Sequence, residues 1–318
     1  MLLIFLFIAA LFLSYSNGAN DNFKGVATLF GGGVLSFKKA LIWSTVTTVL
    51  GSITSVFLAE KLVKNFSGKG LVPDALLLTP EFAIAITFGA AVTVFFATKI
   101  GMPISTTHAL VGGLLGCGII AVGSDFNFVK LGTTFLIPLI FSPLVATFLS
   151  FITYYIVNRL IKNESSKWIN QLHFVSSGIV CFSRALNDTP KIAALLLLVS
   201  FLDLKFGMLT VALAMALGGI LNSRKVAEIM GSKITPMNAN QGFTANLITG
   251  ILVSTASVIG LPVSTTHVSV GSIFGIGIVS KKSDYSVIRN ILMSWFLTLP
   301  FSAIVSSICY LILFFCLK

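Results

Sequence analysis

The sequence predicts an all-α polytopic membrane protein that contains two repeats, with broken or re-entrant helices around a central site. Three observations support this prediction. Hydrophobic residues make up 56% of the chain and charged residues only 10%, whereas a soluble domain carries about 25% charged residues. Apolar runs long enough to cross a bilayer recur along the chain, and two polar motifs each occur twice in the same order.

The excess of basic residues does not indicate a nucleic-acid partner. The formal net charge is +11 at pH 7, but lysines and arginines stand singly or in pairs, without the basic stripe of a nucleic-acid-binding protein. Basic residues placed this way fit loops that anchor membrane spans. We therefore expect a lipid bilayer around the chain, no nucleic acid as a partner, and a multi-pass location in the cell membrane, the inner or plasma membrane of a prokaryote.

Apolar runs of two lengths predict complete and broken spans, since about 20 helical residues cross a bilayer. The longer runs are 41–59, 82–97, 131–157, 209–221, 243–259 and 287–315. The shorter ones, each beside a polar motif, are 1–13, 110–122, 192–202 and 268–279. Broken helices explain the short pieces, because protein or a water-filled cavity can satisfy non-helical backbone at membrane depth. We expect residues 1–13 to be a retained span.

The duplicated motifs divide the chain into an N-terminal repeat (1–157), a polar linker (158–170) and a C-terminal repeat (171–318). An Asn-Asp pair with a lysine three residues later occurs at Asp21 and again 167 residues on, at Asp188. A Ser-Thr-Thr-His segment ends at His108 and again 159 residues on, at His267. Polar interruptions at matching places of two halves point to a transporter with its binding site at the repeat interface.

The Asn-Asp pairs are candidate ligands for a cation. A charge at bilayer depth costs at least about 2.5 kcal/mol, so acidic residues at equivalent repeat positions indicate a function. The carboxylates of Asp21 and Asp188 and the amide oxygens of Asn20 and Asn187 suit a small hard cation such as Na+. The amide N–H groups of the same asparagines can instead face an anion.

The lysines of these motifs have two possible roles. If the segments are helical, Lys24 and Lys191 share a face with Asp21 and Asp188, three residues earlier. Each lysine can form a simple ion pair with its aspartate, or its ammonium can contact an anionic substrate. The two roles do not exclude each other.

The Ser-Thr-Thr triplets that follow Pro103 and Pro262 are candidate ligands for an anion. Proline stops a preceding helix, and serine or threonine just after it is a favoured N-cap. The first turn of the new helix exposes free N–H groups, which bind phosphate-like anions. We expect two such turns to form a cradle for one tetrahedral anion, with hydroxyl donors from Ser105, Thr106, Thr107, Ser264, Thr265 and Thr266.

The residues just after the triplets predict packing. We expect His108 and His267 to be satisfied core residues. Glycines that stand four and eight residues after each histidine predict close helix packing; they are Gly112, Gly116, Gly271 and Gly275.

The strings NGANDNFKG, LNDTPK, GMPISTTH and GLPVSTTH, with the run 231–267, resemble the inorganic phosphate transporter (PiT) family. The resemblance covers most of the chain. It implies two inverted repeats around a shared central site and a membrane protein that is usually a homodimer. It also implies symport of inorganic phosphate with Na+, or with H+ in some branches, and no other cofactor.

Carried over by position, the resemblance implies that Asn20, Asp21, Asn187 and Asp188 bind cation and phosphate. It implies that both triplets bind phosphate, and it adds Gln241, in the NQGF stretch, as a further candidate.

The chain departs from the family pattern in three places. Lys24 stands where the family usually has asparagine. The stretch Arg184–Ala185–Leu186 lacks the usual glycine, and the chain is short, without a long central loop. A fixed ammonium beside Asp21 can take the place of a bound cation.

Alternatives to phosphate symport follow from the same residues. The nearest is a permease for sulfate or another tetrahedral oxyanion on the same scaffold. Phosphate at pH 7 keeps a proton that it can donate to an aspartate, whereas sulfate only accepts hydrogen bonds, so the two aspartates favour phosphate. A passive anion channel would ignore ion gradients.

An intramembrane protease would need two aspartates sharing a proton, or a single catalytic serine. Here a lysine follows each aspartate and the serines are duplicated. We therefore expect no enzyme.

Overall fold

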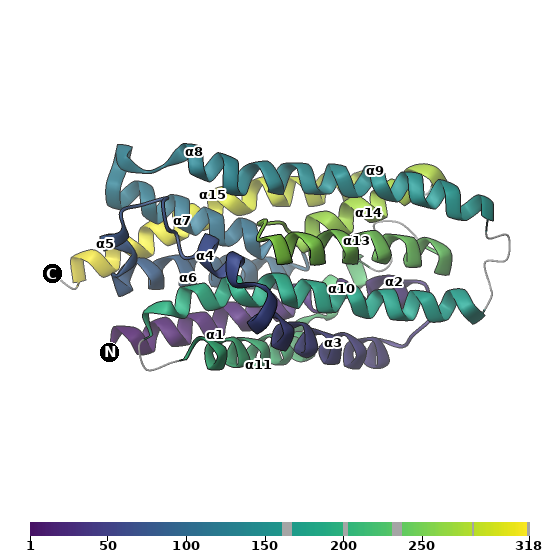
Figure 1. Cartoon of the computed structure of the whole chain (residues 1–318), viewed down its shortest axis with the longest axis horizontal. Coiled ribbons are helices and arrows are strands. Elements are labelled where there is room, and N and C mark those ends of the chain that lie inside the picture. The colour runs from purple at the N-terminus through teal and green to yellow at the C-terminus, as the bar shows by residue number, and fades with distance from the viewer. Residues whose placement is uncertain (161–166, 200–202, 231–236, 282, 317–318) are drawn as a thin grey trace.

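The computed structural model describes residues 1–160, 167–199, 203–230, 237–281 and 283–316. These residues form helices and no strand, and most of the helices run along the long axis of the molecule (Figure 1). In the N-terminal part they are α1 (Leu2–Asp21), α2 (Ala27–Gly31), α3 (Phe37–Leu58), α4 (Glu60–Phe66), α5 (Asp74–Leu77), α6 (Pro80–Ile100), α7 (Thr106–Val122), η1 (Gly123–Asp125), α8 (Phe128–Lys130), η2 (Leu131–Leu136) and α9 (Ile137–Leu160).

The remaining elements are α10 (Lys167–Ala193), η3 (Ala194–Leu198), α11 (Leu204–Asn222), α12 (Arg224–Glu228), α13 (Ala239–Ile259), α14 (Thr265–Ser280) and α15 (Tyr285–Cys316). Each of the six longer apolar runs overlaps one long helix. The predicted linker is only partly described: 158–160 end α9, 167–170 begin α10, and 161–166 lie outside the described residues.

The helices have the length and surface of membrane spans. Among the described residues, eight helical segments are long and apolar enough to cross a membrane, and α14 is a shorter apolar helix. Large apolar side chains such as Phe57, Phe296 and Phe315 lie exposed on the outside of the bundle. Such a surface would be a liability in water and is solvated by lipid. The chain is therefore a multi-pass, all-α membrane protein.

The two Ser-Thr-Thr segments lie at the tips of two helical hairpins. Gly101 (φ 82°) follows the last residue of α6 and Gly260 (φ 84°) that of α13, and each supplies the left-handed C-cap of its helix. A short proline-containing loop follows each cap, and α7 and α14 then pack back against α6 and α13. The α6–α7 hairpin lies toward the end of the molecule that holds both termini, and the α13–α14 hairpin lies toward the opposite end (Figure 1). These breaks confirm the prediction of broken helices at both segments.

The two Asn-Asp motifs differ in their backbone. Helix α1 ends at Asp21, and residues 22–26, which include Lys24, form turns before α2 begins. Helix α10 continues through Asn187, Asp188 and Pro190 to Ala193. The prediction of an unwound segment is therefore confirmed at the first motif and wrong at the second, where the side chains find partners on neighbouring helices and the backbone stays helical.

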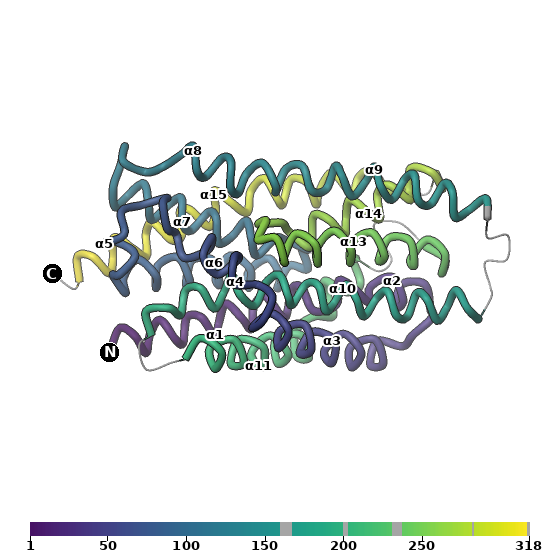
Figure 2. Tube along the Cα trace, in the orientation of Figure 1, coloured from purple at the N-terminus to yellow at the C-terminus, as the bar shows by residue number. Residues whose placement is uncertain are grey.

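The helices of the two sequence halves interlock. Helix α7 packs against α15, and α14 packs against α9; α1 packs against α11, and α10 against α3. Helices α9 and α15 both run along most of the bundle, and each flanks the hairpin of the other half (Figure 2).

Glycines allow the hairpins to approach these long helices closely. A Cβ built on Gly116 would lie 2.2 Å from the carbonyl oxygen of Ala303 in α15, and one on Gly275 would lie 2.2 Å from that of Thr147 in α9. The predicted close packing at the glycine positions is confirmed.

Candidate functional site

The duplicated motifs meet in the middle of the bundle, between α1, α10 and the two hairpin tips. None of the motif residues that we predicted to bind ligand is more than 3% exposed. They are Asn20, Asp21, Lys24, Ser105, Thr106, Thr107, Asn187, Asp188, Lys191, Ser264, Thr265 and Thr266.

The first residue of each triplet caps a helix. The Oγ atom of Ser105 accepts a hydrogen bond from the backbone N–H of His108 (3.1 Å), and that of Ser264 accepts one from His267 (3.2 Å). These contacts confirm the predicted N-caps. Near the start of a helix the backbone N–H groups have no intrahelical partner, so α7 and α14 each present free donors at the hairpin tip.

The last residue of each triplet joins the two tips. The hydroxyl of Thr107 donates to the carbonyl oxygen of Val263 in the other hairpin (3.2 Å). The hydroxyl of Thr266 donates in turn to the carbonyl oxygen of Ile104 (2.7 Å). Because each hydroxyl has one hydrogen, those of Thr107 and Thr266 are committed to protein.

The middle residue of each triplet keeps its hydroxyl hydrogen available. The Oγ1 atom of Thr106 accepts from Asn17 Nδ2 (2.9 Å), and that of Thr265 accepts from Asn187 Nδ2 (3.4 Å). Since an amide N–H can only donate, both threonines act as acceptors in these contacts. Their O–H groups, like those of the two capping serines, therefore remain free to donate to an anion.

The asparagines of the Asn-Asp motifs hold the hairpins. Asn20 Nδ2 donates to the carbonyl oxygen of Met102 (2.9 Å), and Asn20 Oδ1 accepts from the N–H of Ile104 (3.1 Å). Asn187 Nδ2 donates to the carbonyl oxygen of Val263 (3.1 Å). Each asparagine thus fastens the loop of the hairpin in its own half.

Each aspartate forms an ion pair with the lysine of its own motif. Lys24 Nζ contacts Asp21 Oδ1, and Lys191 Nζ lies 3.3 Å from Asp188 Oδ1. The local ion pair that the sequence allowed is therefore present in both halves.

Two further buried residues complete the centre, and we did not predict either of them. Asn17 Nδ2 lies within hydrogen-bond distance of Asp21 Oδ2 (3.2 Å), Asp188 Oδ2 (3.1 Å) and Thr106 Oγ1. Arg184 donates from one terminal nitrogen to Asn17 Oδ1 (2.9 Å) and from the other to Thr48 Oγ1 (2.9 Å). The repeat offset could have revealed them, because Asn17 and Arg184 both stand four residues before the motif aspartate.

The structure places Gln241 in a different environment. Its side chain forms a capping box with Asn238 at the start of α13 and donates to the hydroxyl of Tyr154 (3.0 Å).

The His267 ring stacks on Trp295 with centroids 3.7 Å apart, and the His108 ring lies 4.4 Å from that of His267. These are the contacts of core residues, but His108 Nδ1 and His267 Nε2 have no hydrogen-bond partner among the described residues, so the rings are not fully satisfied as we expected.

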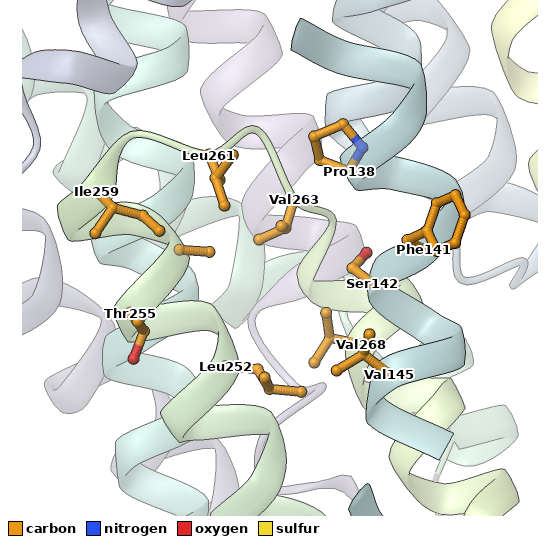
Figure 3. Close-up of a pocket in the computed structure, with 11 residues that line it drawn as sticks. Pro138, Phe141, Ser142, Val145, Leu252, Thr255, Ile259, Leu261, Val263 and Val268 are labelled. Atoms are coloured by element: carbon orange, nitrogen blue, oxygen red, sulfur yellow. The ribbon is translucent and has the colours of Figure 1, made fainter. Parts of the chain in front are cut away.

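A cavity open toward the outside of the bundle borders each hairpin tip. The cavity beside the second tip has a volume of about 260 Å³ and lies between α9 and the α13–α14 hairpin, with Leu261 and Val263 on its wall (Figure 3). The cavity beside the first tip has a volume of about 630 Å³ and is lined at the equivalent positions by Met102 and Ile104. Each tip is therefore bordered on its outer side by an apolar hollow that opens toward the outside of the bundle.

Comparison with known proteins finds relatives that match nearly the whole chain. A probable low-affinity inorganic phosphate transporter of Rhizobium meliloti is 30% identical, over 97% of this chain and 96% of the relative. Another probable low-affinity inorganic phosphate transporter, of Bacillus subtilis, is 27% identical over 98% of this chain and 97% of the relative. A solved structure described as the sodium-dependent phosphate transporter shares the fold, with a TM-score of 0.89 over 99% of both chains at 23% identity.

The family match spans both copies of both motifs. The model described as the phosphate transporter family matches residues 17–306. This family and the relatives above are transporters and not enzymes. The chain belongs to the phosphate transporter family.

Proposed function

We propose that the chain is a secondary transporter that moves inorganic phosphate across the membrane together with a cation, Na+ or H+. The observation that carries the proposal is the meeting of two capped helix starts, from α7 and α14, at a buried centre between hairpins. A helix N-terminus binds an anion through free N–H groups and the helix dipole. Two of them can surround one tetrahedral anion.

The side chains around these helix starts fit phosphate. The hydroxyls of Thr106 and Thr265 can donate to its oxygens, and the nearby cation Arg184 can offset its charge. A proton retained by phosphate can be donated to Asp21 or Asp188, whereas sulfate offers none. This difference favours phosphate over sulfate at this centre.

Coupling to a cation is proposed on energetic grounds. Bringing one negative charge into a cell with a negative interior costs about 2.3 kcal/mol per 100 mV. Uptake therefore needs a co-transported cation that at least offsets the anion. By their oxygen chemistry, Asp21 and Asp188, with Asn20 and Asn187, are the proposed ligands if that cation is Na+.

The halves 1–157 and 171–318, joined by 158–170, are proposed to be inverted repeats in a homodimer of the cell membrane. The two hairpins, which lie toward opposite ends of the molecule, support the inversion. An experimental map of the purified protein in lipid nanodiscs checks both points. We expect two copies per particle and halves related by an axis in the membrane plane. A monomer would contradict the homodimer, and halves related by an axis along the membrane normal would contradict the inverted repeats.

Counterflow in proteoliposomes tests the function. Vesicles loaded with unlabelled phosphate should take up labelled phosphate, because a carrier exchanges substrate across the membrane. Arsenate, which has the same shape and also keeps a proton, should compete strongly, and sulfate weakly. Equal competition by sulfate would favour a general oxyanion permease. Labelled uptake that does not depend on phosphate inside the vesicle would favour a channel.

A further inference from the structure

We infer that Lys24 and Lys191 are tethered cations that occupy two monovalent-cation positions of the transport site, so that this carrier binds and moves phosphate without Na+. The inference rests on the proposed function and deepens it, since it concerns which cation the same site uses.

The first observation is the set of atoms around Lys24. Its Nζ donates to the carboxylate of Asp21, to the carbonyl oxygen of Ile104 (2.9 Å) and to the hydroxyl of Thr266. A carboxylate, a peptide carbonyl and a hydroxyl are hard oxygen ligands, the kind that a small alkali cation takes. In this chain an ammonium group fills the position that they surround.

The second observation is that the other half repeats this arrangement. Lys191 Nζ donates to Asp188 Oδ1 (3.3 Å), to the carbonyl oxygen of Val263 (2.8 Å) and to Thr107 Oγ1 (2.7 Å). The same three kinds of oxygen at equivalent repeat positions surround the same kind of cation. A lysine with only a local role would not reproduce this set twice.

The third observation is that each ammonium connects the two hairpins. Lys24 contacts the carbonyl of Ile104 in the first tip and Thr266 of the second, and Lys191 contacts Val263 and Thr107 with the roles of the tips exchanged. A cation at either position therefore holds the tips together around the centre. A coupling ion would have this effect, and here a side chain supplies it permanently.

The balance of buried charge supports the same inference. Two anions, Asp21 and Asp188, face three cations, Lys24, Lys191 and Arg184, and none of these five residues is more than 2% exposed. Singly charged phosphate can balance the excess positive charge by itself. Because Lys24 and Lys191 already pair with both aspartates, no carboxylate is left to compensate a Na+ ion, whereas a proton can travel on the phosphate itself. Of the two cations proposed above, H+ is then the one left to drive uptake, because a tethered ammonium cannot leave with the substrate.

The experiment compares phosphate counterflow in Na+ and in choline media. The wild-type rate should be the same in both. Lys24→Asn and Lys191→Asn each empty one position while leaving its oxygens in place. In choline their rates should fall by about 100-fold or more, since removing one partner of a buried ion pair leaves an uncompensated charge. Na+ should restore much of the rate, and the variants should show a saturable Na+ activation that the wild type lacks.

Two matched variants separate this effect from general damage. Lys64→Asn makes the same change in an exposed pair with Glu60 (3.0 Å), and its rate should equal that of the wild type in both media. The double variant Asp21→Asn with Lys24→Asn removes the carboxylate as well, and it should show no Na+ activation. A melting curve in detergent decides the matter even for inactive variants, because Na+ should raise the melting temperature of Lys24→Asn and leave that of the wild type unchanged.

Each outcome bears on one proposal. A strict Na+ requirement of the wild type would overturn the inference, and so would lysine variants whose rate and melting temperature ignore Na+. Absence of labelled exchange by the wild type in either medium would overturn the proposed function instead, and the Na+-dependent melting of the variants would still test the lysine positions.

Discussion

Replacing Thr106 or Thr265 by valine is expected to weaken phosphate binding by about 5- to 150-fold. Valine keeps the shape of threonine and removes the hydroxyl. A buried anion oxygen that loses its donor costs about 1–3 kcal/mol, which corresponds to that range of affinity. The hydroxyl hydrogens of Thr106 and Thr265 are free to donate, whereas those of Thr107 and Thr266 bind carbonyl oxygens of the opposite tip. Binding of labelled phosphate to the purified protein measures the effect.

Thr87→Val is the matched control for this pair. Thr87 is also buried, but its hydroxyl donates within α6 to the carbonyl oxygen of Ala83 (2.6 Å). The control should keep the phosphate affinity of the wild type. If Thr106→Val and Thr265→Val both keep it too, the two helix starts do not bind the anion through these hydroxyls.

The local features of the hairpins could be predicted from the sequence. A proline followed two residues later by Ser105 or Ser264 signals a helix stop and a new N-cap, because these preferences depend on a few neighbouring residues. Both caps are present. The close approach of Gly116 and Gly275 to neighbouring helices also follows from spacing along one helix face.

The course of α10 through the second Asn-Asp motif could not be predicted. A charged pair at membrane depth suggests unwound backbone, but α10 stays helical at Asp188. The carboxylate there is satisfied by Lys191 of its own helix and by Asn17 of α1. The second partner lies 171 residues away in the sequence, so local pattern carries no sign of it.

The roles of the lysines were only half determined by the sequence. The spacing of three residues predicts a shared helix face with the aspartate, which holds for Lys191 in α10, while Lys24 lies in a turn after α1; both ion pairs exist. The contacts of Lys24 with Thr266 and of Lys191 with Thr107 depend on how the two hairpins meet. That meeting is set by the packing of α7 and α14 against the long helix of the other half, which no single segment encodes.

The site residue with the largest expected effect is one that we did not predict, Asn17. Its amide group lies between both aspartates, Thr106 and Arg184, all buried. Asn17→Leu keeps the number and branching of the side-chain heavy atoms and removes every one of these hydrogen bonds. Each buried group left without its partner costs about 1–3 kcal/mol, and charged groups cost more. We therefore expect phosphate counterflow to be abolished and the melting temperature in detergent to fall.

Asn22→Leu separates the contribution of the charged centre from that of any buried asparagine. Asn22 is equally buried, but its side chain bonds only neutral groups in the hydrogen bonds that the structure describes, donating to Thr45 (3.1 Å) and accepting from Thr48 (2.8 Å). This control should lose less stability than Asn17→Leu and should keep measurable counterflow, because both aspartates retain their partners. Equal losses of stability and transport in the two variants would mean that Asn17 acts only as one more buried polar contact. A folded Asn17→Leu protein with the wild-type rate would show that the two aspartates and Arg184 do not need this amide to hold the phosphate site together.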